Sequence, residues 1–109
     1  MSGVDVAGST PNAGRGEAAL EIGGETLLLR PSFAALVAAE AELGPLFALV
    51  ERAADGKLSL GDLVTLFWHC LTDRERLTRE ALGEAVLAAG LARVSPVLKA
   101  VIGQILAGR

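Results

Sequence analysis

Short apolar runs with helical spacing fill most of residues 32–107, and a glycine, a proline or a small polar residue separates each run from the next. Alanine and leucine, both strong helix formers, dominate these runs. The chain has only three Phe, one Trp and no Tyr, so its helices must approach one another closely through small side chains. The pattern therefore predicts a mainly α (α+β) fold, with about five short helices packed as a small bundle.

A pair of glycines predicts the β component. Gly23 and Gly24 lie between two short apolar runs, Ala18–Ile22 and Glu25–Arg30. Gly-Gly accepts the positive φ angles of a two-residue turn, so we expect an N-terminal β-hairpin that packs its apolar face on the helices. We expect one face of the pair to carry Leu20, Ile22, Leu27 and Leu29.

Local start and stop signals predict the bounds of the helices. We expect helices from Phe33 to Gly44 after a Ser32 cap, from Pro45 to about Ala54, from Leu60 to Leu71 after Ser59, up to about Ala89 before Gly90, and from Ser95-Pro96 onward. The start of the fourth helix stays open, because Thr72 and Thr78 are both plausible caps.

Helical periodicity also predicts which side chains form the core. The residues expected to face the core are Phe33, Leu36, Val37 and Leu43; Leu46, Phe47, Leu49 and Val50; and Leu60, Leu63, Val64, Phe67 and Leu71. In the last helix, a continuous apolar stripe either binds a partner or is buried against the third helix; it consists of Val97, Leu98, Val101, Ile102, Ile105 and Leu106. Leu66 and Trp68 lie on opposite shoulders of the third stripe. These two side chains widen the apolar arc of the third helix beyond what one buried face needs. We therefore expect Leu66 and Trp68, together with Val101 and Ile105 from the stripe of the last helix, to bind a partner. On the back of the last helix, Ala100, Gly103 and Ala107 are expected to be exposed rather than to contact a helix.

Composition limits the remaining possibilities. Residues 1–16 are rich in Gly, Ser, Pro and Asn and are expected to form a flexible leader, with residues 17–109 as a single domain. The net charge of −3 argues against a phosphate-backbone binder. Cys70 is the only cysteine, so no internal disulfide is possible. With no signal peptide and no membrane span expected, the predicted location is the cytoplasm.

The residues that carry chemistry are sparse. His69 and Cys70 are each the only one of their kind, and as neighbours on a helix they diverge by about 100° and cannot form a nucleophile–base pair. We expect a buried Cys70, a solvated His69, no metal or cofactor site, and no enzymatic activity.

Two further features of the fourth and fifth helices bear on function. Glu75 with Arg79 and Arg76 with Glu80 have the spacing of ion pairs along one helix. Residues 78–107 also have the outline of a helix-turn-helix, but the second helix offers only Ser95, Lys99 and Gln104 amid aliphatic residues. A DNA-binding regulator is therefore the least favoured function, because base edges are read by Arg, Gln or Asn near the start of such a helix.

The order of these elements resembles a known family. A glutamate-x-x-leucine-glycine helix end at Glu40–Gly44 and the Leu-Ser-Leu-Gly-Asp-Leu helix start at residues 58–63 are similar to those of the small gene-transfer-agent and phage tail-assembly chaperones, also labelled tail tube proteins. The resemblance covers roughly residues 15–107. It implies a cytoplasmic factor that binds the tape-measure protein while the tail tube protein polymerises around it. A structural tail component, and a homo-oligomer, remain alternatives.

Overall fold

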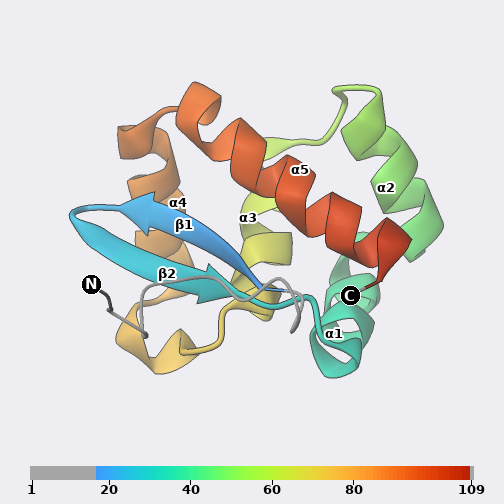
Figure 1. Ribbon diagram of the computed structural model, residues 1–109, viewed down its shortest axis with the longest axis horizontal. Helices are drawn as coiled ribbons and strands as arrows, with labels where there is room; N and C mark the ends of the chain where they lie inside the picture. Colours follow the sequence, from blue (N-terminus) through green and yellow to red (C-terminus); the bar gives the residue numbers. More distant parts are fainter. Residues whose placement is uncertain (1–16, 109) are drawn as a thin grey trace, which may run out of the picture.

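The computed structural model describes residues 17–108, and within them a two-stranded hairpin is followed by five α-helices (Figure 1). This confirms the mainly α fold with an N-terminal hairpin. The elements are β1 (Ala18–Ile22), β2 (Glu25–Leu29), α1 (Phe33–Leu43), α2 (Leu46–Ala54), α3 (Leu60–Cys70), a 3-10 turn at Arg74–Arg76, α4 (Arg79–Ala89) and α5 (Leu91–Ala107). The expected leader, residues 1–16, lies outside the described residues.

The hairpin follows directly from its glycines. Gly23 and Gly24 have φ angles of 59° and 77°, which side chains other than glycine rarely adopt and which a tight hairpin turn requires. The resulting antiparallel register pairs Leu20 with Leu27. All four residues expected on one face, Leu20, Ile22, Leu27 and Leu29, are buried, and β1 packs against α5 and α4.

The strand β2 ends at Leu29, but its pairing continues with the end of α3. The N–H of Arg30 donates to the carbonyl of Cys70 at 2.7 Å, and the N–H of Thr72 donates to the carbonyl of Leu28 at 3.0 Å. These bonds fix the segment that enters α1 beside the segment that leaves α3.

Helix α3 lies at the centre of the core and packs against α1 and α4 (Figure 1). The hydroxyl of Ser59 accepts a hydrogen bond from the N–H of Asp62 at 3.1 Å, as expected for the cap. Leu63, Val64 and Phe67 are buried as predicted, whereas Leu60 in the first turn is 39% exposed.

Helix α2 is attached to its neighbours by two polar contacts. The carboxylate of Glu40 accepts a hydrogen bond from the N–H of Leu46 at 2.7 Å, which satisfies a free donor at the helix start. Arg52 donates to Asp62 of α3 at 3.1 Å. The main helical neighbour of α2 is α1.

The fourth and fifth helices differ in how well the sequence predicted their starts. Thr78 is the cap of α4, because its hydroxyl accepts from the N–H of Ala81 at 3.0 Å. The predicted start of α5 at Ser95-Pro96 is wrong: the helix begins at Leu91, and Pro96 lies inside it. Because Pro96 has no N–H, it cannot donate a hydrogen bond to the preceding turn, and this is a cost inside a helix. The earlier start offsets that cost by letting α5 bury Val94, which is 1% exposed.

None of the helices within residues 17–108 is long and apolar enough on its own to cross a membrane. Two pairs of consecutive helices, α1 with α2 and α4 with α5, reach the length and composition only together, across bends of 81° and 118°.

Candidate partner-binding surface

Helix α1 exposes two of its large apolar side chains to solvent. Phe33 is 86% exposed and Val37 is 48% exposed, and their spacing of four residues places them on one face. The buried residues of α1 are instead Ala35 and Ala39. The expectation that Phe33 and Val37 belong to the core is therefore wrong.

The physical reason is the packing of α1 on α3. Large side chains of α3, including Leu66 and Phe67, are fully buried. Alanines on the facing side of α1 let the two helices approach closely, whereas a phenylalanine there would need space that α3 already fills. Leu36 and Leu43, which flank the alanine face, are partly buried against the core.

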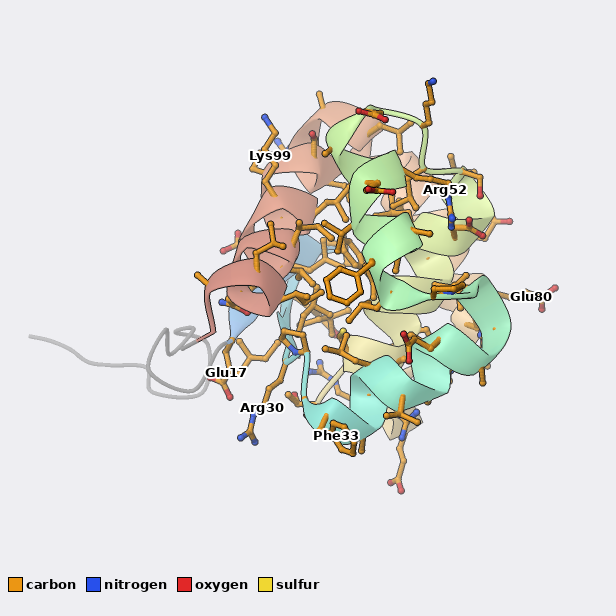
Figure 2. The ribbon with its side chains drawn as sticks, turned by 90° about the vertical axis from the view of Figure 1, so that its right-hand side faces the viewer. Glu17, Arg30, Phe33, Arg52, Glu80 and Lys99 are labelled. Carbon is orange, nitrogen blue, oxygen red and sulfur yellow. The ribbon has the colours of Figure 1, made fainter. Side chains whose placement is uncertain are left out.

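Helix α2 repeats this arrangement. Leu49 is 1% exposed, whereas Phe47, two positions earlier and so about 200° away around the helix, is 85% exposed. The expected core position of Phe47 is wrong for this reason. Both α1 and α2 run along the face of the molecule seen in Figure 2, where Phe33 is labelled. We call Phe33, Val37 and Phe47 the α1–α2 apolar surface.

A second apolar feature is a shallow groove between α2 and α5. It encloses about 300 Å³ and is lined by Ala53 and Ala54 on one side and by Leu98, Ile102 and Leu106 on the other. Leu106, a member of the predicted apolar stripe of the last helix, is 67% exposed. The small residues on the back of α5, Ala100, Gly103 and Ala107, are exposed as predicted.

The structure places the four predicted partner-binding residues differently. Leu66 and Val101 are each 0% exposed, so neither offers a surface in this fold and the expected exposed shoulder at Leu66 is wrong. Trp68 and Ile105 are partly buried against the core. Leu66 is enclosed because α3 is covered on more than one side, by α1 and by α4.

A polar cluster at Trp68 joins three helices. Glu42 of α1 accepts a hydrogen bond from His69 Nε2 of α3 at 2.6 Å and two from the guanidinium of Arg79 of α4, at 2.7 and 3.1 Å. The guanidinium of Arg79 also lies 5.7 Å from the centre of the Trp68 ring, within the range of a cation–π interaction. Hydrogen bonds from Arg79 and His69 lower the pKa of Glu42 from 4.5 to about 2.

This cluster corrects two expectations. The His69 side chain is only 9% exposed rather than solvated, because it is held against α1 by Glu42. Arg79 pairs with Glu42, and Arg76 pairs with Glu25 of the hairpin, rather than with the helix neighbours Glu75 and Glu80. The reason is that residues 74–76 form a separate turn, so they do not share a helix with α4.

The other chemically interesting side chains stay isolated. Cys70 is buried as predicted, and burial raises the pKa of its thiol to about 12, which suppresses the reactive thiolate. Within residues 17–108, no group of three or more His, Cys, Asp or Glu side chains is placed to hold a metal ion. The exposed first turn of α5 offers one charged side chain, Arg93, beside an exposed Leu91.

Phe33 and Phe47 are the surface residues that sequence reasoning missed. Helix α1 reads FAALVAAEAEL and is apolar around most of its circumference, so periodicity does not define which face turns inward. The available signal was the alanine pair at residues 35 and 39, which marks a face suited to close helix packing.

Comparison with known protein families gives a match over most of the chain. A family model described as "Phage tail tube protein, GTA-gp10" matches residues 15–108. Searches of curated proteins and of solved structures found no match. Since the match spans nearly the whole chain, this protein belongs to the gene-transfer-agent family of phage tail tube proteins and is related to phage-type tails.

Proposed function

We propose that this protein is a tail-assembly chaperone, a cytoplasmic protein without catalytic activity that binds the tape-measure protein and assists assembly of the tail tube. Family membership supports a tail-related role. The observation that carries the further step is the exposure of two phenylalanines, Phe33 at 86% and Phe47 at 85%, on adjacent helices.

The energetic argument rests on what these rings gain from a partner. Full burial of a phenylalanine side chain is worth about 2–3 kcal/mol relative to exposure. Aromatic side chains at the centre of an interface commonly dominate its binding energy. The α2–α5 groove suits an amphipathic helix, which buries its own apolar stripe in such a groove. The α1–α2 apolar surface offers further apolar side chains to the same class of partner. A long helical tape-measure protein would offer many such stripes.

A second candidate is a structural component that stays in the tail and contacts the tail tube protein or further copies of itself. The description of the family as tail tube proteins favours it. The same apolar surface would then be buried permanently between subunits, so the two candidates differ in where the protein is found after assembly.

The test is coexpression with the cognate tape-measure protein. The wild-type chain should keep that partner soluble and copurify with it. The double variant Phe33→Ser with Phe47→Ser should keep native circular dichroism and bind at least about tenfold more weakly, because truncated interface aromatics cost about 1–2 kcal/mol or more. Leu87→Ser on α4, where the side chain is 54% exposed outside this surface, is the matched control and should bind normally.

Purified tails separate the two candidates. A chaperone should be absent from finished tails, whereas a structural component should be present in a fixed ratio to the tail tube protein. An insoluble tape-measure protein together with abundant copies of this chain in tails would contradict the chaperone proposal.

A further inference from the structure

The outer edge of β1 carries backbone groups that no strand within residues 17–108 pairs. The two-residue turn makes Ile22 and Leu20 the residues that exchange ladder hydrogen bonds with β2. Ala19 and Glu21 alternate with them, so their N–H and C=O groups point away from β2. In the described part of the chain these outward groups have no hydrogen-bond partner.

The opposite edge of the hairpin shows how such groups are used in this fold. Leu28 of β2 lies opposite Ala19 and also turns its backbone outward. Its carbonyl accepts a hydrogen bond from the N–H of Thr72 at 3.0 Å. The hairpin therefore has one edge that is paired with the chain leaving α3, and one edge, that of β1, whose ladder ends.

Helix α5 runs beside the outer edge of β1 and forms the second wall of a groove (Figure 1). The groove encloses about 270 Å³ and is lined by Ala19, Leu20, Glu21, Arg93, Val94 and Val97. We call it the β1–α5 groove. A strand edge beside a helix is a place where an extended segment can add to a sheet by backbone pairing, with side-chain specificity from the helix.

Gln104 of α5 supplies a separate indication of an added segment. Its Nε2 donates to the carbonyl of Glu17, at the start of β1, at 2.7 Å. Its Oε1 is buried and has no hydrogen-bond partner within residues 17–108. Buried polar atoms in folded proteins nearly always have a partner. The acceptor that is left over needs an N–H donor, which an extended backbone alongside β1 brings.

We propose that the β1–α5 groove binds an extended segment of a partner protein, which adds to β1 as a third strand. Side chains of such a segment alternate in direction. Those that turn toward α5 meet Val94 and Val97 and are aliphatic. Those that turn outward lie beside the exposed Glu21 and are basic, because opposite charges on neighbouring strands attract. Arg93, which makes no ion pair in the described part of the chain, disfavours basic side chains on the inward set.

A second copy of this chain fits the groove less well. If β1 paired antiparallel with itself around Leu20, the Glu21 side chains of the two copies would be neighbours on one face, and like charges there are destabilising. The inference goes beyond the chaperone proposal and does not depend on it, because the groove shares no residue with the α1–α2 apolar surface.

The experiment is an NMR titration of the full-length 15N-labelled chain at constant ionic strength. The probe is the peptide Val-Lys-Val-Lys-Val with both ends capped. It should produce saturable shifts at the amides of Ala19 and Glu21 and slow their hydrogen exchange, because the added strand accepts from them. The peptide Val-Glu-Val-Glu-Val should bind about fivefold more weakly or less, and a fully N-methylated form of the lysine peptide should not bind.

Two variants with matched controls test the strand edge. Ala19→Pro removes one outward donor and leaves the ladder bonds intact, as proline on an edge strand does. It should weaken binding of the lysine peptide about tenfold, the upper range for one hydrogen bond. Thr26→Pro makes the same change on the outer edge of β2 and should bind normally. Glu21→Gln should weaken binding about fivefold, whereas Glu84→Gln, exposed on α4, should have no effect.

Several results would overturn the proposal. Saturable shifts at Phe33 and Phe47 without protection of the Ala19 amide would place the peptide on the α1–α2 apolar surface instead. Equal losses in Ala19→Pro and Thr26→Pro, or binding of the N-methylated peptide, would exclude backbone pairing at β1. Equal affinity for the glutamate peptide would overturn the assignment to a basic segment, and the absence of any saturable shift would overturn the site. If Ala19→Pro loses native circular dichroism, the N-methylated peptide decides the question on the wild-type chain.

Discussion

Helices α1 and α3 are both 11 residues long and mostly apolar, yet their phenylalanines lie in opposite environments. In α3, Leu66 and Phe67 are fully enclosed. In α1, Phe33 lies in solvent while Ala35 and Ala39 are buried. The comparison teaches that a phenylalanine packs in the core in one helix and stays exposed to solvent in the other, because the neighbouring elements decide which face of each helix is covered.

The largest expected effect tests the enclosed side of this comparison. Phe67→Ala should lower the free energy of unfolding by about 3–5 kcal/mol, because it removes a fully buried ring and leaves a cavity. Small domains are stable by only about 5–15 kcal/mol, so the variant should be close to unfolded. Urea denaturation followed by circular dichroism measures the loss. A loss below about 1 kcal/mol would mean that Phe67 is not a core residue.

The next effect tests the close approach of α1 to α3. Ala39 is 0% exposed, and Ala39→Leu should cost about 1–3 kcal/mol through overpacking. The same substitution at exposed Ala41 of the same helix is the matched control and should be nearly neutral. If leucine is tolerated equally at both positions, the alanine face does not set the helix distance.

A smaller effect concerns the polar cluster that joins α1 to α3 and α4. The pKa of Glu42 is lowered to about 2 in the fold from an ordinary 4.5, so its ionised form stabilises the protein fully above about pH 4.5. That contribution is lost as the pH falls toward 2. The melting temperature of Glu42→Gln should therefore be below that of the wild type at neutral pH, and the difference should shrink as the pH is lowered through this range.

Glu80→Gln provides the comparison for that measurement, because Glu80 is exposed and makes no ion pair in the described part of the chain. Its difference from the wild type should be small at every pH. A constant difference between wild type and Glu42→Gln down to about pH 2 would contradict the cluster as a source of stability.

The smallest expected effect tests the exposed side of the comparison. Phe33→Ser should change the free energy of unfolding by no more than about 0.5 kcal/mol, as surface substitutions usually do. The same urea titration measures it beside Phe67→Ala. A cost above about 1 kcal/mol would show that Phe33 packs on the domain and is not free to bind a partner.

Much of the fold was predictable from local signals. The hairpin turn at Gly23-Gly24, the cap at Ser32 and the stop at Gly90 lie where the sequence indicated. The candidate surface was much less predictable. Two of the four partner-binding candidates, Leu66 and Val101, are buried, and the exposed phenylalanines had been expected in the core.

The sequence by itself determined where most elements begin and end, because turn and cap preferences act between residues only a few positions apart. Only the tertiary structure decided that Phe33 faces solvent, that α5 starts at Leu91 and that Arg79 pairs with Glu42. Each of these depends on side chains from distant parts of the chain that compete for the same space or the same charge. An apolar run that is apolar on every side does not contain the information about which of its faces its neighbours will cover.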